Sequence, residues 1–192
     1  MMKLEVPPGN GRILLHSCCA PCSGAILECM VENGLKPVVF FSNSNIDTEE
    51  EFLKRLGEVR RYCGTLGLEV VADRYDHGDW LSAVRGLENE PERGARCLKC
   101  FKYRLLRAAR YASENGFGLL TTSLASSRWK SLEQVDEAGR SAVGQIGDAG
   151  GTDLQWWPQN WRKGGLQPRR SEIIKEQGFY NQTWCGCEFS KK

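Results

Sequence analysis

The stretch Arg12-Ile-Leu-Leu-His16-Ser-Cys18-Cys19-Ala-Pro21-Cys22-Ser23 joins a short apolar run directly to a group of cysteines. The apolar run predicts a buried β-strand, and Pro21 followed by Ser23 is typical of a helix start. The expected helix ends at Gly34 and carries apolar residues at helical spacing, namely Ile26, Leu27, Met30 and Val31. A buried strand that leads directly into a helix begins a βαβ unit, so this stretch favours an α/β fold.

The same alternation continues along the chain. Further strands are expected at residues 37–41, 68–72, 117–121 and 153–157. Helices are expected after a capping-box start at Asp47 and Glu50, from about Trp80, and over residues 97–115, 131–145 and 171–177. This spacing predicts a single α/β domain over residues 1–192, a three-layer, Rossmann-like parallel sheet with helices on both faces. In such sheets, ligands bind beyond the carboxyl ends of the strands, where the strand order reverses.

The composition is that of an ordinary globular protein, with 192 residues, 41% hydrophobic and 26% charged. The longest apolar runs, at residues 13–15 and 37–41, are far shorter than the roughly 20 residues of a membrane helix. Because the first residues also lack a signal-peptide pattern, we expect a cytoplasmic protein with no membrane contact. In that reducing compartment, nine cysteines favour metal ligands or catalytic thiols over a disulfide framework.

Two cysteine pairs, Cys18-Cys19 and Cys97-x-x-Cys100, together supply the four thiolates of a [4Fe–4S] cluster or a tetrahedral zinc ion. Adjacent cysteines diverge, which suits the larger iron–sulfur cluster, so we favour the cluster over a zinc ion that fastens the helix to the sheet. The basic residues around the second pair are expected to lower the thiol pKa values; they are Arg93, Arg96, Lys99 and Lys102.

The remaining cysteines differ in character. Cys185-Gly186-Cys187 predicts either a strained, reversible redox pair or further metal ligands, and the spacing leaves both open. Cys22 lies one turn beyond Cys18 and either faces the same site, as a spare or second-metal ligand, or turns into the helix interface. Cys29 and Cys63 occupy apolar helix faces and are expected to be core residues.

Aromatic and basic residues alternate at Arg128-Trp129-Lys130 and between Trp156 and Arg170, as single-stranded or looped RNA requires. A basic ridge is expected on the helix after the second cysteine pair, from Arg104, Arg107 and Arg110. The alternative is that the tryptophans are core or lid residues and the arginines a solvated face. The net charge of only +2 makes any case for nucleic acid a local one.

Other polar residues at strand ends carry weaker signals. His16 is more typical of a hydrogen-bonded structural residue than of a proton donor. The hydroxyl run at residues 121–127 either binds phosphate or ribose or simply shapes a turn. Cysteine and proline stand where a Gly-rich phosphate loop would follow the first strand, which argues against an enzyme that uses ATP.

Taken in order, these motifs resemble the cobalamin-independent epoxyqueuosine reductases of the QueH type. The resemblance spans nearly the whole chain and rests on several ordered motifs, Leu15-His-Ser-Cys-Cys-Ala-Pro-Cys-Ser23, Phe41-Ser-Asn-Ser-Asn-Ile46, Cys97-x-x-Cys100-Phe-Lys-Tyr-Arg, Thr121-Thr-Ser-Leu124 with Lys130, and Tyr180-Asn-Gln-Thr-Trp-Cys185-Gly-Cys187. The chain departs from the usual pattern at Arg128-Trp129, commonly Pro-His, and at Asn181 and Trp184, commonly Arg and Tyr.

The resemblance implies an enzyme that reduces the epoxide of epoxyqueuosine at the wobble position of tRNA, the last step of queuosine synthesis. By position, a [4Fe–4S] cluster would be held by Cys18, Cys19, Cys97 and Cys100. Cys185 and Cys187 would form the redox-active pair, and Cys22 would be a candidate ligand of a second metal beside the cluster. The partners would be tRNA and an unidentified electron donor. Trp129 replaces a possible proton donor, so the general acid is unassigned.

Two other functions compete with this one. An ATP-dependent tRNA thiolase of the PP-loop type also uses an α/β sheet and cysteines, but the missing Gly-rich loop disfavours it. A zinc-fastened RNA-binding module would bind tRNA without redox chemistry.

Overall fold

The computed structural model describes residues 2–8, 11–150 and 153–191, and these form a parallel sheet with helices on both faces. The strands of the sheet are β1 (Ile13–His16), β2 (Val38–Phe41), β3 (Val70–Ala72), β4 (Leu119–Thr122) and β5 (Gln155–Trp156). The helices are α1 (Ala20–Glu32), α2 (Glu49–Thr65), α3 (His77–Ala83), α4 (Ala95–Glu114), α5 (Leu132–Asp148) and α6 (Leu166–Glu176). Two short 3-10 turns, η1 (Ser123–Ser126) and η2 (Glu188–Ser190), follow β4 and end the described chain.

The strands lie in the order β3-β2-β1-β4-β5, and every pair is parallel. The chain moves outward from β1 to β3 and then crosses to β4 on the other side of β1, so the strand order reverses between β1 and β4. His16 at the end of β1 pairs with Thr122 at the end of β4, which places both carboxyl ends at one level. This is the crevice where an α/β sheet binds its ligands. The expected three-layer α/β architecture is confirmed.

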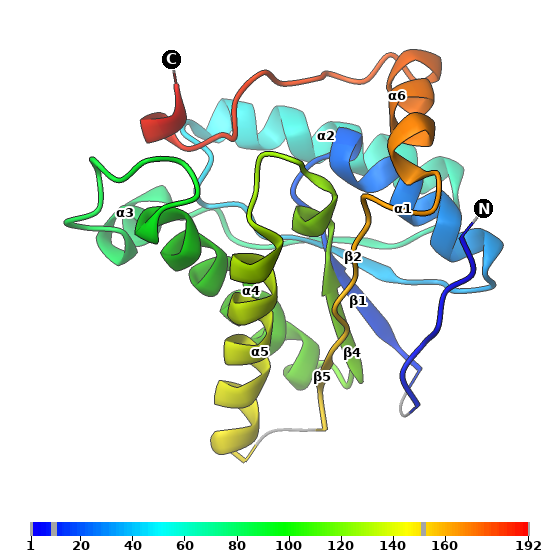
Figure 1. The fold of residues 1–192 in the computed structure, drawn as a ribbon, viewed down its shortest axis with the longest axis horizontal. Coiled ribbons are helices and arrows are strands. Elements are labelled where there is room, and N and C mark those ends of the chain that lie inside the picture. Colours follow the sequence, from blue (N-terminus) through cyan, green and yellow to red (C-terminus); the bar gives the residue numbers. More distant parts are fainter. Residues whose placement is uncertain (1, 9–10, 151–152, 192) are drawn as a thin grey trace.

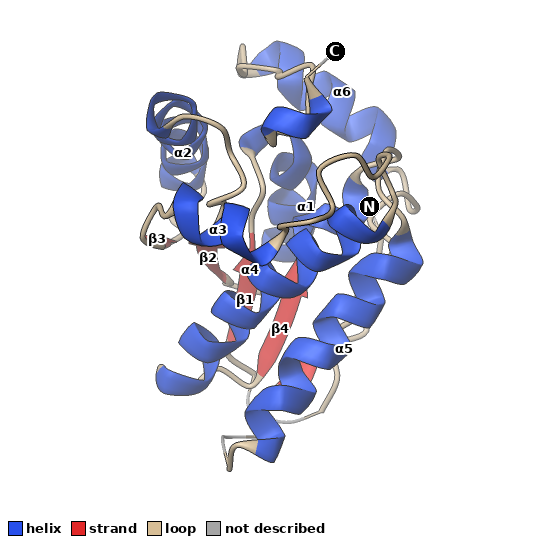
Figure 2. Ribbon diagram, turned by 90° about the vertical axis from the view of Figure 1, so that its left-hand side faces the viewer, coloured by secondary structure: helices blue, strands red, loops and turns tan. Residues whose placement is uncertain are grey.

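The helices cover the sheet in two groups. α1 packs against α2 and α6, whereas α4 packs against α5. Figure 2 shows α4 and α5 side by side in front of β1 and β4. The central strand β1 is completely buried, and one continuous apolar core joins it to both helix layers. No helix of the described ranges is long and apolar enough to cross a membrane.

Several element boundaries differ from the sequence-based expectation, and two of these differences have a clear physical cause. Thr48, not Asp47, caps α2, because the Thr48 hydroxyl accepts a hydrogen bond from the Glu51 backbone N–H at 3.2 Å. Helix α6 begins at Leu166 rather than Ser171, because Pro168 lies in its first turn, where a missing backbone N–H costs no helical hydrogen bond. Both differences lie at helix starts, whereas the type and order of the elements were predicted correctly.

Candidate metal and redox site

Three cysteines gather where β1 passes into α1. The sulfur atoms of Cys18, Cys19 and Cys22 all lie within 4.8 Å of one another, and the three side chains are buried. The Cys18 and Cys19 sulfurs are 3.9 Å apart. Of the two orientations expected for Cys22, the structure shows the one that faces this site.

Hydroxyl groups that follow β4 hold this cysteine turn in place. The Cys18 backbone N–H donates to Ser123 Oγ at 3.0 Å, and the Ser123 hydroxyl lies 3.3 Å from the Cys18 sulfur, to which it donates. The Ser126 hydroxyl donates to the Cys22 carbonyl at 3.0 Å. These serines therefore join the two strands at the switch point and orient the sulfur atoms. The expected parallel sheet already indicated this contact. When two neighbouring parallel strands end at the same level, the residues that follow them lie close together.

The pKa values of these three thiols are shifted in different directions. The pKa of Cys18 is held well below its ordinary value, because the thiols of Cys19 and Cys22 donate to its sulfur and the charges of Lys130 and Arg104 favour the thiolate. The thiolate of Cys18 in turn raises the pKa of Cys19 and raises that of Cys22 to about 11, and burial adds to both shifts. Binding of a metal here would therefore displace protons from Cys19 and Cys22.

The second cysteine pair begins α4. Cys97 is half-buried and Cys100 is buried, and neither joins the 4.8 Å group around Cys18 among the described residues. Burial raises the pKa of Cys97 and raises that of Cys100 to about 11. Basic neighbours act in the expected direction, since Arg96 lowers the pKa of Cys97 and Arg104 that of Cys100, but burial outweighs them and the net shift is opposite to the expected one.

The contacts of those basic residues explain the difference. Arg96 is 3% exposed and donates to the backbone carbonyls of Leu87 and Glu88. Lys102 forms an ion pair with Glu137 at 2.6 Å. Only Lys102 is neutralised by an acid; the charge of Arg96 still favours the Cys97 thiolate, but desolvation is the larger effect and decides the direction of the pKa shift.

The C-terminal segment completes the site. Cys187 and Cys100 belong to one small apolar cluster with Trp80 and Val84, whereas Cys185 is exposed. Gly186 between them has a φ of +114°, a conformation that favours glycine. All nine cysteines are free thiols in this structure.

Residues from three parts of the chain line one narrow cavity of about 40 Å³, called here the thiol cavity. Its wall includes Cys97, Cys185, Cys187 and Lys130. The fold thus brings Cys185 and Cys187 beside the second cysteine pair, as a shared site requires.

Lys130 connects the thiol cavity to the first cysteine group. Burial alone would lower its pKa, but the thiols of Cys185, Cys18 and Cys22 outweigh this effect and raise it. Its ammonium group therefore remains charged in the middle of the cysteines. The sequence placed Lys130 in an RNA-binding stretch, and only the path of the loop after η1 brings it into the site.

His16 is a structural residue, as expected. Its Nε2–H donates to the Ser42 carbonyl at 3.1 Å, so its Nδ1, 2.7 Å from the Thr122 hydroxyl, is free to accept a hydrogen bond. Burial and the nearby charge of Arg104 lower its pKa from 6.5 to about 3, so the ring is neutral.

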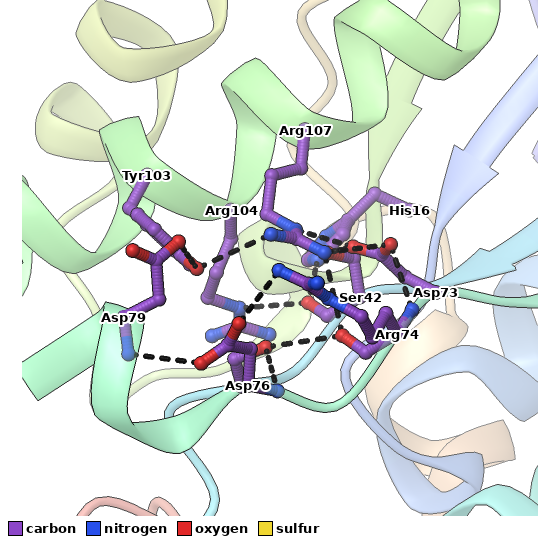
Figure 3. A network of polar contacts seen from close by, with 10 residues as sticks. His16, Ser42, Asp73, Arg74, Asp76, Asp79, Tyr103, Arg104 and Arg107 are labelled. Carbon is purple, nitrogen blue, oxygen red and sulfur yellow. Dashed lines mark hydrogen bonds and ion pairs between the residues drawn. The ribbon is translucent and has the colours of Figure 1, made fainter.

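The expected basic ridge on α4 is wrong. Arg104 is 2% exposed and donates to the Ser42 carbonyl and the Asn43 side chain. Figure 3 shows Arg107 and Ser42 converging on Asp73, to which Arg107 forms a two-pronged ion pair at 2.5 and 2.8 Å. These arginines therefore bind together the strand ends beside the cysteines and offer little charge to a ligand.

The tryptophans divide between core and surface. Trp157 and Trp161 are buried, and Trp161 donates from Nε1 to the Thr122 carbonyl at 3.1 Å. Trp156 is half-buried and donates to Asp136 at 3.2 Å. Trp129, in contrast, is 76% exposed. The core interpretation thus holds for Trp157 and Trp161, and among the described tryptophans Trp129 alone is exposed.

Cys29 and Cys63 are fully buried core residues, as expected. A second group with metal-ligating atoms within 4.8 Å consists of Asp47, His77 and Glu188. Its members already have internal partners, because His77 bonds to the Ser44 carbonyl and Glu188, each at 2.8 Å, and Lys191 pairs with Asp47.

The first cysteine group and the α4 pair offer the donor set that a metal–thiolate centre needs. Every sulfur is an unpaired thiol, and soft thiolates favour iron–sulfur clusters and zinc. The Ser123 hydroxyl on the Cys18 sulfur is the kind of outer contact that orients a metal ligand. The residues present therefore fit such a group.

Comparisons with known proteins agree with this chemistry. A family model described as epoxyqueuosine reductase QueH matches residues 13–192. An epoxyqueuosine reductase QueH of Histophilus somni is 42% identical over 98% of this chain and 75% of the relative, and one of Acinetobacter baylyi is 41% identical over 98% and 84%. A third, from Thermotoga maritima, is 30% identical over 94% of this chain and 90% of the relative.

Proposed function

Because this chain belongs to the epoxyqueuosine reductase QueH family, we propose that it reduces the epoxide of epoxyqueuosine at the wobble position of tRNA. The product is queuosine, and the step is the last of its synthesis. The runner-up activity, an ATP-dependent thiolase, lacks support from the family and from the β1–α1 connection, where Cys18, Cys19 and Pro21 replace a glycine loop.

The chemistry requires two electrons and two protons. They convert the epoxide to a carbon–carbon double bond and release its oxygen as water. Oxidation of Cys185 and Cys187 to a disulfide supplies both electrons and both protons, and an external electron donor then restores the two thiols. This role is supported by the free thiols, the exposure of Cys185 and the glycine conformation at Gly186.

We assign the cofactor to the other two cysteine pairs. Cys18, Cys19, Cys97 and Cys100 would hold a [4Fe–4S] cluster, and Cys22 is positioned to bind a second metal beside it. Such a cluster would pass the donor's electrons one at a time to the Cys185–Cys187 disulfide and so restore the two thiols. Lys130 places a positive charge between these cysteines and Cys185, where it stabilises thiolates.

The observation that supports this proposal is that Cys97, Cys185 and Cys187 line one cavity with Lys130, whose charge also acts on Cys18 and Cys22. The test is anaerobic purification with iron, sulfide and zinc analysis, followed by an assay on tRNA that carries epoxyqueuosine. We expect about four irons and four sulfides per chain with broad visible absorption. Stoichiometric zinc and no colour after anaerobic reconstitution would contradict the proposal and favour a binding module.

Variants separate the two cysteine roles. Cys97→Ala should lose the cluster and its colour, whereas Cys185→Ala should keep the iron and lose turnover. Cys63→Ala is the matched control, because Cys63 is a buried cysteine of α2 outside the site, and it should keep both. Full activity in Cys185→Ala would show that the redox-pair assignment is wrong.

A further inference from the structure

A broad groove of about 650 Å³ adjoins the thiol cavity, and its size differs sharply from the cavity's 40 Å³. The smaller space is close to the volume of a single water molecule, whereas the larger lies within the range of ligand-binding sites, about 300–1,000 Å³. Arg93 and Trp129 line both. A nucleotide that presents a small reacting group to Cys185 would therefore place its bulk in the groove.

The groove is positively charged and holds no compensating acid. Arg93, Arg128 and Arg170 line it, and neither Asp nor Glu does so among the described residues. Arg93 and Arg170 donate to backbone carbonyls, which leave the positive charge uncancelled. Burial and the charge of Arg93 lower the pKa of the neighbouring Arg162, as expected where like charges gather. We call this feature the arginine groove.

One wall of the arginine groove is a loop, residues 127–130, whose backbone is fixed by two arginines. Arg162 donates to the carbonyls of Ser127 and Lys130 at 2.7 and 2.8 Å. Arg93 donates to the carbonyls of Arg128 and Trp129 at 2.6 and 3.1 Å. All four consecutive carbonyls are thereby held, and the loop presents its side chains from a rigid backbone.

Two side chains of this loop, those of Arg128 and Trp129, have no hydrogen-bond or ion-pair partner in the part of the chain that the structure describes. Trp129 is 76% exposed, and Arg128 is exposed with no ion pair to any residue in the described part of the chain. A large aromatic ring therefore lies in solvent beside three arginines, where a ligand can reach it. An aromatic plane with adjacent arginines is the combination that stacks an unpaired base and contacts its phosphates.

The opposite wall joins the groove to the first cysteine group. Arg170 of α6 donates from Nε to the carbonyl of Pro21 at 2.8 Å, and Pro21 lies between Cys19 and Cys22. Gln167 donates to the Ser126 carbonyl at 3.0 Å, and the Ser126 hydroxyl in turn donates to the Cys22 carbonyl. The wall of the groove is therefore hydrogen-bonded to the turn that carries Cys19 and Cys22.

We propose that the arginine groove binds the anticodon loop of the substrate tRNA, with one unpaired base stacked on Trp129 and its phosphates held by Arg128 and Arg170. This inference rests on the proposed function, because it places the nucleotide that flanks the modified base. The modified base itself would then point its epoxide into the thiol cavity.

Binding is measured first, without turnover. The protein as purified is titrated into a fluorescent, unmodified anticodon stem–loop, and anisotropy gives the affinity at several salt concentrations. Trp129→Ala should weaken binding about tenfold or more, and Trp129→Phe should restore most of it because it keeps an aromatic plane. Arg128→Gln should reduce the salt slope of log affinity by about one.

The controls are exposed side chains outside the groove. Leu53→Ala removes an exposed apolar residue of α2, and Arg110→Gln removes an exposed charge near the far end of α4. Both should keep the wild-type affinity and salt slope. Wild-type binding by Trp129→Ala and Arg128→Gln would overturn the proposal.

Turnover then separates this inference from the proposed function. On epoxyqueuosine-containing tRNA, Trp129→Ala should raise KM with kcat little changed, as loss of binding predicts. If the wild-type protein binds the stem–loop through Trp129 but reduces no epoxide, the groove stands and the function fails. If Trp129→Ala reduces the tRNA with wild-type KM, the function stands and the groove assignment fails.

Discussion

Lys130 occupies the position in which a single charge acts on several sulfurs. Its ammonium group favours the thiolates of Cys18, Cys22 and Cys97, which come from the β1–α1 turn and from α4. Lys130 is half-buried and has no carboxylate partner in the described part of the chain, so its charge is costly unless anions compensate it, and here thiolates do so. Lys130 therefore links the protonation of the two cysteine groups.

We predict that Lys130→Met weakens metal binding by the cysteines. Without the ammonium group, the pKa of Cys18 rises and each bound metal must displace more protons. The loss should be about 10- to 100-fold in affinity for a divalent metal added to the metal-free protein.

The matched variant is Lys99→Met. Lys99 lies two residues after Cys97 in sequence, but its side chain is exposed on α4. It should bind metal like the wild type, and thiolate absorbance at neutral pH should fall only in Lys130→Met. Equal loss in both variants would show that general charge, and not the position of Lys130, is responsible.

The sequence predicted those candidate site residues whose type and spacing are typical of metal or redox sites. The cysteine pairs and the Cys-Gly-Cys segment can be recognised from residue type and separation alone. In the structure, Cys97, Cys185 and Cys187 line one cavity. Arg104 could not be predicted, because its burial depends on Ser42 and Asn43, about sixty residues away. Lys130 was missed for the same reason, since proximity to thiols is a property of the folded chain.

At the scale of elements, the C-terminal segment is the part of the site that depends most on a few polar contacts. The Asp47 backbone N–H donates to the Gly186 carbonyl at 2.8 Å, and Arg55 donates to the Cys185 carbonyl at 3.2 Å. Glu188 bonds to His77 and Lys191 to Asp47. These contacts hold Cys185 and Cys187 against α2 and α3.

We predict that Glu188→Ala loosens this segment without unfolding the sheet. Amide hydrogen exchange around residues 185–190 should accelerate severalfold, because local opening then breaks fewer contacts. Alkylation of the buried Cys187 should accelerate as well, whereas exchange in β1 and β4 should not change. Arg74→Ala breaks the exposed Arg74–Asp76 pair and should leave both rates as in the wild type. Unchanged exchange in Glu188→Ala would show that the His77 contact does not hold the segment.

The helices and strands were predicted from hydrophobic periodicity and turn residues. The helix starts that were placed wrongly show what this method misses. α6 begins at Leu166, before the expected start at Ser171, because Pro168 is compatible with a first turn. The cap of α2 shifted by one residue because Asp47 is engaged by Lys191 and Gly186, leaving Thr48 to bond the helix N-terminus. Local pattern predicts the helix, and tertiary contacts decide its first residue.

At the scale of the whole molecule, His16 belongs to the buried core and also lies beside the candidate site. This residue ends the central strand, one position before the cysteine turn, and is completely buried. Its neutral ring connects β2, through Ser42, to β4, through Thr122. The protonation of one side chain is therefore coupled to the integrity of the sheet.

We predict that stability of the metal-free protein falls as pH drops below about 6.5. The folded pKa of His16 is about 3 and its ordinary value 6.5, so in this range the unfolded chain binds a proton that the folded protein does not. His16 should contribute a loss of about 1.4 kcal/mol per pH unit over part of this range. Urea unfolding of wild type and His16→Gln across pH checks this, and the variant, though less stable, should show a shallower slope. Parallel curves would contradict the assignment.

Arg93 has a φ of +67°, a left-handed conformation that costs a non-glycine residue about 1–2 kcal/mol. Glycine at this position would relax the backbone while removing the guanidinium that holds Arg128 and Trp129. Selection for stability alone would thus accept a change that releases the loop facing the tRNA. At Arg93, therefore, stability and substrate binding favour different residues. Directed evolution for heat resistance would be expected to weaken substrate binding at this position first.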